Sequence, residues 1–166
     1  MKKYAFSLIE VMIAVVLVGL AVVSLVAANS VFTQNNSAAL DISTAEYLIE
    51  QIRELTMQNL PPGTGMLPVT DPDGGTEFAT TEASYALYDD VEDFDNAIFS
   101  PPIDAARQPL TAFASFSQKI TVQKVHPSDF TQAVADSYSS NFVRITVDIY
   151  HHGQKLSSES WIRAKY

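Results

Sequence analysis

An uninterrupted apolar segment near the N-terminus constrains this sequence more than any other feature. It runs from Phe6 to Ala28, and Glu10 is its only ionisable side chain. A helix of about 23 residues is roughly 34 Å long, which is enough to cross the hydrocarbon core of a bilayer. Lys2 and Lys3 precede it, and basic residues beside a membrane helix favour the cytoplasm for that end. The sequence therefore predicts a membrane helix over 6–28, with the following residues on the far side of the membrane.

The carboxylate of Glu10 needs an explanation in such a segment. A charged side chain at the centre of a membrane helix costs about 2.5–3.5 kcal/mol on insertion scales. Two explanations are open from this residue alone. Either Glu10 lies near the interface and extends its carboxylate to water, or the charge has a function inside the membrane.

The residues around Glu10 resemble the start of type IV prepilins and type II secretion pseudopilins. That family has a short basic leader, a small residue at the cleavage point, and Phe-Ser/Thr-Leu-Ile/Val-Glu leading into an apolar helix. The run Phe6-Ser7-Leu8-Ile9-Glu10 matches at every position. The resemblance implies a leader peptide at 1–5, cleavage between Ala5 and Phe6 by a prepilin peptidase, and N-methylation of Phe6.

The resemblance also implies partners and a location. In the family, the glutamate at the position of Glu10 attracts the N-terminal amine of a neighbouring subunit during assembly. The implied partners are the prepilin peptidase, other pilin or pseudopilin subunits and an inner-membrane assembly platform. The implied location is the bacterial inner membrane, in a single pass with a periplasmic head, and then a pilus or pseudopilus.

Two positions depart from the usual family pattern. Ala5 stands where glycine is usual before the cut, and Ala27 stands where many major pilins have a proline. The chain also has no cysteine, whereas a cysteine pair is common among major pilins. The missing cysteine pair and helix proline favour a subunit of the minor-pilin type, whereas Ala5 bears on the rate of cleavage.

A secretory signal is the alternative interpretation of the N-terminus. Val26-Ala27-Ala28 ahead of Asn29 has the small residues of a signal cleavage site. The apolar run is longer than the core of about 7–15 residues that is typical of such signals, which disfavours this alternative. In this alternative the protein is a binding module, either exported and released after Ala28 or anchored singly by its helix, that uses its acidic loop for Ca²⁺ or a basic partner.

Residues 29–60 are predicted to continue the helix in amphipathic form. Glu50 and Arg53 are three residues apart on the polar face, so they can pair across one turn. Pro61-Pro62-Gly63 is expected to end the helix. The apolar face recurs at helical spacing and consists of Ala38, Ile42, Ala45, Leu48, Ile49, Ile52 and Leu55.

The remainder, residues 61–166, is predicted to form a globular head with three antiparallel strands at about 113–125, 142–151 and 155–164. Alternation is clearest in the second strand, where Val143, Ile145, Val147 and Ile149 share one face. His151-His152-Gly153-Gln154 is expected to be a hairpin turn. His126–Ser140 is expected to be a polar connection, and Leu156, Ile162 and Ala164 are expected to share a face. The predicted class is therefore α+β, with the long helix covering a small antiparallel sheet.

The segment 71–104 is predicted to be an acidic loop. Its densest part contains Asp89, Asp90, Glu92, Asp93 and Asp95. Carboxylates are the oxygen ligands that Ca²⁺ prefers, so Asp89, Asp90, Asp93 and Asp95 are candidate metal ligands. The spacing lacks the glycine and terminal glutamate of an EF-hand, and a solvated loop without metal or other cofactor is the favoured interpretation.

Composition and motifs argue against other functions. The formal charge is −9, and removal of Lys2 and Lys3 with the leader makes it −11. A chain this acidic is a poor partner for nucleic acids. The sequence has no Gly-rich phosphate loop, no Gly-x-Ser-x-Gly elbow and no His-Glu-x-x-His. We therefore do not expect an enzyme.

Overall fold

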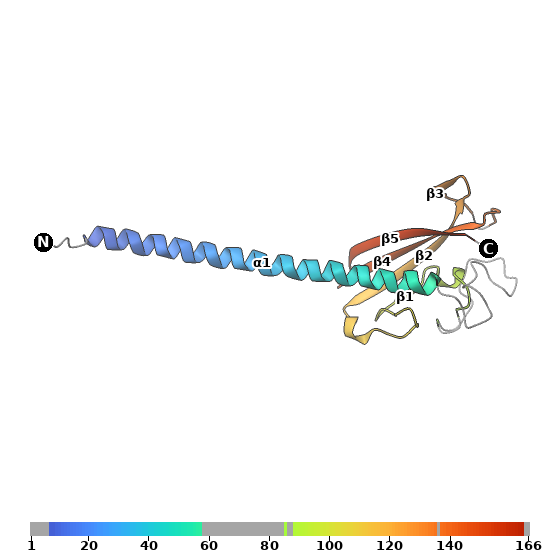
Figure 1. Ribbon diagram of the computed structural model, residues 1–166, viewed down its shortest axis with the longest axis horizontal. Coiled ribbons are helices and arrows are strands. Elements are labelled where there is room, and N and C mark those ends of the chain that lie inside the picture. Colours follow the sequence, from blue (N-terminus) through green and yellow to red (C-terminus); the bar gives the residue numbers. More distant parts are fainter. Residues whose placement is uncertain (1–6, 58–84, 86–87, 136, 165–166) are drawn as a thin grey trace. The chain divides into compact units, whose positions relative to one another are not determined.

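A computed structural model describes residues 7–57, 85, 88–135 and 137–164 of the chain. The leader, the cleavage site Ala5-Phe6, the end of the predicted helix and the first part of the acidic loop lie outside the described residues. The chain divides into two compact units, Met1–Leu40 and Asp41–Tyr166. Figure 1 labels the helix and the strands, which are α1 (Leu8–Met57), β1 (Ile98–Phe99), β2 (Phe116–His126), β3 (Asp129–Ala133), β4 (Phe142–His151) and β5 (Gln154–Ala164). Two short 3₁₀ turns span Glu92–Phe94 and Thr111–Phe113.

The first unit consists, within the described residues, of the N-terminal part of α1. Every residue from Ser7 to Leu40 is exposed, including large apolar side chains such as Leu8, Val15 and Leu25. No proline interrupts the segment, and its residues include many good helix formers. Among the described residues, α1 is the one helix long and apolar enough to cross a membrane.

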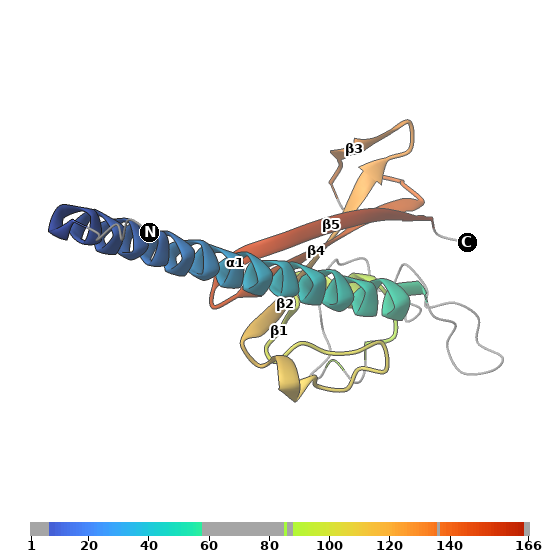
Figure 2. The same cartoon turned by 60° about the vertical axis from the view of Figure 1, so that its left-hand side comes forward.

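The second unit, which we call the head, contains an antiparallel sheet in the order β1-β2-β4-β5, with β3 paired to the end of β2 (Figure 2). β4 and β5 are joined through a two-residue turn at His152 and Gly153, both with positive φ, as a tight hairpin of this kind requires. The strands β1 and β3 were not predicted. Both lie in segments that were predicted to be loops. Strand patterning gave no signal there, because β1 and β3 are short and β3 is exposed throughout.

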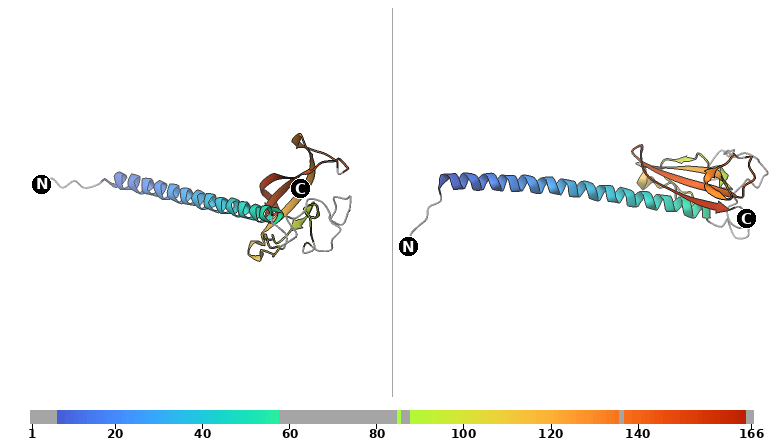
Figure 3. Two further views of the ribbon diagram at one scale, coloured as in Figure 1. Left: turned by 45° about the vertical axis from the view of Figure 1, so that its right-hand side comes forward. Right: turned by 90° about the horizontal axis from the view of Figure 1, so that it is seen from above.

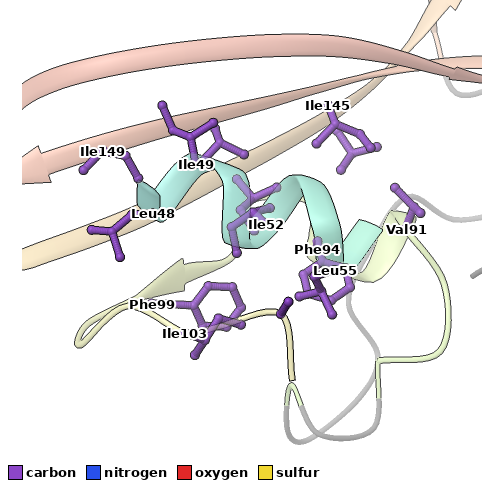
Figure 4. Packing of buried hydrophobic residues seen from close by; sticks show 14 of the residues in the cluster. Leu48, Ile49, Ile52, Leu55, Val91, Phe94, Phe99, Ile103, Ile145 and Ile149 are labelled. Atoms are coloured by element: carbon purple, nitrogen blue, oxygen red, sulfur yellow. The ribbon is translucent and has the colours of Figure 1, made fainter. Parts of the chain in front are cut away.

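The part of α1 that belongs to the head, residues 41–57, packs on one face of this sheet (Figure 3). The alternation predicted for β4 is confirmed, because Val143, Ile145, Val147 and Ile149 are all buried. Figure 4 shows the helix side chains between the sheet and the segment that carries Phe99 and Ile103. The fold is therefore α+β, as predicted, with the long helix on a small antiparallel sheet. The buried helix residues are Ala45, Leu48, Ile49, Ile52, Leu55 and Thr56, so Ala38 and Ile42 of the predicted apolar face lie outside the core.

The prediction for the face of β5 was wrong, and a β-bulge explains why. The pairing register between β4 and β5 shifts between Ile149 and Tyr150, which leaves Leu156 as an extra residue in β5. Leu156 still packs against the core. Beyond the bulge, Ile162 and Ala164 lie on the face away from α1. The residues that pair with the buried side chains of β4 are Ser157, Glu159, Trp161 and Arg163.

Polar and aromatic side chains therefore attach β5 to α1. Arg53 forms an ion pair with Glu159 at 2.5 Å, and its guanidinium lies 5.0 Å from the centroid of the Trp161 ring. Arg163 is buried and donates a hydrogen bond to the carbonyl of Thr56. This carbonyl is in the last turn of α1, where backbone acceptors lack a partner within the helix. The same Arg53 makes the predicted pair with Glu50, at 3.0 Å.

A fully buried glutamine connects three segments of the head. The side-chain oxygen of Gln118, in β2, accepts a hydrogen bond from the N–H of Ile103 at 2.8 Å. Its amide nitrogen donates to the carbonyls of Leu48 and Ile103, at 3.0 and 3.2 Å. Gln51 of α1 accepts a further bond from the N–H of Ala105 at 3.1 Å. The loop after β1 is thus held to the helix and the sheet by amide side chains.

Replacing Gln118 by leucine should destabilise the head by about 2 kcal/mol, because the side-chain volume is kept while the buried N–H of Ile103 loses its acceptor. Chemical denaturation of a soluble fragment beginning at Asn29 measures the change. Gln132→Leu, in the exposed strand β3, is the matched control and should change the stability by less than about 0.5 kcal/mol. Equal effects of the two substitutions would contradict the role given to Gln118.

Candidate functional site

Glu10 lies in the first turn of α1, among exposed apolar side chains. Its neighbours Leu8, Ile9, Val11 and Met12 all expose more than half of their surface. An ionised carboxylate in apolar surroundings loses favourable hydration unless an opposite charge or hydrogen-bond donors compensate. The first turn of a helix has unpaired N–H groups and the positive end of the helix dipole, which favour a negative charge there.

Ser7 begins the helix in a way that the sequence analysis missed. The N–H of Glu10 donates to the hydroxyl oxygen of Ser7 at 3.3 Å and to its carbonyl at 3.1 Å. The N–H of Val11 also donates to this carbonyl, at 3.3 Å. A serine followed three residues later by a glutamate is the spacing of a capping box, so the signal was present in the sequence. Ser7 therefore fixes where the helix starts relative to Glu10.

The second candidate site is the acidic turn, which we define as Asp89, Asp90 and Asp93. One carboxylate oxygen from each of these residues lies within 4.8 Å of the others. Asp93 accepts hydrogen bonds from the N–H groups of Asp89 and Asp90, at 2.9 and 3.3 Å, and Asp90 accepts one from the N–H of Asp93 at 3.0 Å. These reciprocal bonds close the turn that leads into the 3₁₀ helix at Glu92–Phe94.

Asp95, the fourth candidate ligand, has a different partner. One of its carboxylate oxygens accepts a hydrogen bond from the N–H of Val122 in β2 at 2.7 Å, and the other accepts one from the side-chain amide of Asn96, also at 2.7 Å. Its carboxylate is not among the group formed by the acidic turn. Three of the four predicted ligands are thus close together, and the fourth instead joins the turn to the sheet.

The electrostatics of the acidic turn disfavour ionisation of Asp90. Asp90 is buried, and burial removes water from its carboxylate. This loss of hydration is the main reason why the pKa of the Asp90 carboxyl is raised to about 6. The charges of Asp93 and Asp89 raise it further, while the hydrogen bonds from the backbone N–H groups of Asp93 and Glu92 oppose the shift. A cation at this position would favour the ionised form.

The histidines have partners other than a metal-ligand set. His151 lies 3.4 Å from the carboxylate of Asp41 and stacks on the ring of Phe116, with centroids 4.2 Å apart. The hydroxyl of Ser128 is within hydrogen-bond distance of His126. Within the described part of the chain, the group of carboxylates in the acidic turn that could hold a metal includes no histidine.

A family comparison bears on the N-terminal site. Residues 1–27 match the family model of the prokaryotic N-terminal methylation motif, which is the prepilin-type motif. No curated protein and no solved structure matches the chain significantly. The chain thus carries, over this N-terminal part, the motif of processed subunits of the type IV pilin or pseudopilin type, which are structural proteins. This motif and the apolar helix indicate membrane anchoring.

Asp90→Asn should stabilise the head at pH 7.5 by about 1–2 kcal/mol relative to the wild type, and the gain should vanish near pH 4. The folded-state pKa of Asp90 is about 6, above its ordinary 3.8. The carboxyl of Asp90 therefore binds a proton more tightly in the folded wild type than in the unfolded chain. The stability of the wild type falls as the pH rises from about 3.8 to about 6. Asparagine keeps an oxygen acceptor for the N–H of Asp93 and carries no charge.

Denaturation of the soluble fragment at pH 4 and pH 7.5 measures the effect. Asp129→Asn is the control, because Asp129 is exposed and hydrogen bonds from Thr131 lower its pKa. A gain for Asp90→Asn of the same size at both pH values would show that ionisation of Asp90 is not its cause.

Proposed function

We propose that this protein is a structural subunit, a minor pilin or pseudopilin, of a type IV pilus or a type II secretion pseudopilus. The observation that carries the proposal is the prepilin-type motif at residues 1–27, in register with the apolar part of α1. In this proposal a prepilin peptidase cleaves between Ala5 and Phe6, and Phe6 becomes the methylated N-terminus. The subunit then joins other pilin or pseudopilin subunits through its helix, with the help of the inner-membrane assembly platform.

The proposed orientation follows from charge. Lys2 and Lys3 stay in the cytoplasm before cleavage, and the head is periplasmic. The part of α1 from Leu8 to Ala28 is exposed throughout and apolar apart from Glu10 and Ser24, so lipid in the stored subunit and neighbouring helices in the filament are the surroundings that suit it. Neither requires catalytic chemistry or a cofactor from this chain.

The proposed role of Glu10 is to bind the N-terminal amine of a neighbouring subunit. Opposite charges interact more strongly in apolar surroundings than in water. Each charge also relieves the cost of burying the other, provided that the geometry brings them into contact. The cap at Ser7 places Glu10 one turn into the helix, close to the end where that amine must arrive.

The first test is the intact mass and N-terminal residue of the protein from cells that contain a prepilin peptidase. We expect a chain that begins at Phe6 with an added methyl group. Glu10→Ala should be cleaved normally and yet lower the amount of assembled protein at least tenfold, because loss of one partner of a buried charge pair is strongly destabilising. Sheared filament fractions, probed for this chain, measure assembly.

Glu10→Asp, which keeps the charge, and Asp129→Ala, which removes a carboxylate from the exposed strand β3, are the controls. A chain beginning at Asn29 would identify a secretory signal instead and would end the filament proposal. Normal filaments from Glu10→Ala would leave the processing proposal standing and remove the proposed role of Glu10.

A second candidate function is an exported or singly membrane-anchored binding module whose acidic loop binds Ca²⁺. The observation in its favour is the approach of three carboxylates in the acidic turn. If this site binds Ca²⁺, calorimetry of the soluble fragment will give heat with Ca²⁺ and a higher melting temperature. Asp89→Asn with Asp93→Asn should remove both effects. The absence of heat and of a melting shift at millimolar Ca²⁺ would exclude the site.

A further inference from the structure

The sheet of the head has one face turned away from α1, and among the described elements β3 lies against one end of it, where Arg144 donates hydrogen bonds to the carbonyls of Phe130 and Thr131. We define the outer face as the side of β2, β4 and β5 turned away from α1, on which the pairing register places Lys119, Thr121, Arg144, Thr146, Asp148 and Lys155. Three of these side chains are cationic and one is anionic. The outer face is therefore positive on a chain whose formal net charge is −9.

The single carboxylate on the outer face is already neutralised by its neighbours. Asp148 forms an ion pair with Lys155 at 2.6 Å and accepts a hydrogen bond from the hydroxyl of Ser158 at 2.5 Å. Burial alone would raise the pKa of the Asp148 carboxyl, but these bonds and the charge of Lys119 outweigh it and lower the pKa. Lys155 balances Asp148, and Arg144 donates to neutral acceptors, namely Gln123 and two carbonyls of β3. Lys119 and Arg144 therefore leave the outer face with a net positive charge.

The opposite side of the head carries the complementary charge. We define the acidic stripe as Glu46, Glu50 and Glu54, which are all exposed on α1. They are four residues apart, so they lie on successive turns of one side of α1. Glu50 pairs with Arg53 at 3.0 Å, so the negative charge of the stripe comes mainly from Glu46 and Glu54. Tyr47 lies on the same side with 45% of its surface exposed. Aromatic residues at exposed positions of this kind are enriched in protein interfaces.

We propose that the outer face of one subunit binds the acidic stripe of a second copy of this chain. The inference rests on the proposed function, because it names the surfaces through which neighbouring heads meet. The head part of α1, which carries the acidic stripe, packs on one face of the sheet (Figure 3), and the register places the outer face on the other side, so the two surfaces cannot pair within one chain. Contact between two different surfaces of identical subunits is heterologous, and a heterologous contact that does not close into a ring extends into a helical filament.

Cross-linking tests whether the two surfaces meet. The chain has no cysteine, so a variant with Glu46→Cys and Lys119→Cys has only the two introduced thiols. With a short bismaleimide, applied to cells that contain the peptidase and the assembly machinery, we expect a ladder of cross-linked chains. Glu46→Cys alone and Lys119→Cys alone should give no ladder. In the proposed contact, position 46 of one chain faces position 119 of the next, so a single introduced thiol has no second thiol opposite it. Glu46→Cys with Gln132→Cys, on the exposed strand β3, is the matched control.

Charge exchange tests whether the contact is electrostatic. Lys119→Glu and Glu46→Lys should each lower the filament-associated fraction about fivefold or more, because like charges then face each other across the contact. The double variant should restore assembly to within about twofold of the wild type, because it re-creates the opposite charges. Lys119→Gln and Gln132→Glu each make the net charge more negative by one, and only the first should weaken assembly.

The outcomes separate this inference from the proposed function. Wild-type chains that begin at Phe6 and enter filaments, without the ladder and without rescue by the double variant, would overturn the contact and leave the subunit function intact. Wild-type chains that are not processed at Phe6, or never enter a filament, would overturn both. Melting temperatures of the charge variants within about 3 °C of the wild type would exclude misfolding as the cause of lost assembly.

Discussion

The apolar surface of the N-terminal part of α1 is the constraint on which the rest of the molecule depends. From Ser7 to Leu40 every described residue is exposed, and burial of apolar surface is the main favourable term in folding and association. This surface must therefore be covered from outside the chain. Lipid meets the requirement without selectivity, whereas a neighbouring helix meets it with defined geometry. A single carboxylate at Glu10 distinguishes the two environments, because only a protein neighbour can offer it a fixed opposite charge.

The head solves the opposite problem, since its own elements must cover one face of a small sheet. Apolar packing does this in the middle, where Leu48, Ile49 and Ile52 meet β2 and β4. At the margins the contacts are polar. Gln118 holds the loop after β1, and Arg53 with Arg163 holds the edge strand β5. Because each of these groups is buried or half-buried, its hydrogen bonds specify one arrangement, which apolar contacts alone would specify less strictly.

The sequence predicts those parts of the structure that follow from periodicity. The helix stripe, the alternation in β4 and the hairpin at His152-Gly153 are local patterns. The last two appear as predicted, and the stripe is buried from Ala45 to Leu55 but not at Ala38 and Ile42. The face of β5 was predicted wrongly because one inserted residue, Leu156, reverses the alternation, and a bulge has no clear signature in a serine-rich strand. The partners of Gln118 are 15 and 70 residues away in the sequence, and no local pattern encodes such a contact. At the N-terminus, Glu10 was identified from its neighbours, whereas the cap at Ser7 was overlooked despite its regular spacing.

The acidic turn shows why a cluster of carboxylates does not by itself imply a metal. Asp90 and Asp93 each accept hydrogen bonds from backbone N–H groups where the 3₁₀ helix begins, so these side chains hold the turn even without a cation. Local hydrogen bonds explain why aspartate is favoured there. They do not remove the repulsion among three neighbouring charges. Burial is the main cause that raises the pKa of Asp90 to about 6, and this repulsion adds to it. A bound cation would reverse this shift and lower the pKa. The ionisation of Asp90 is therefore the property that distinguishes a turn held by its own hydrogen bonds from a turn that holds a metal.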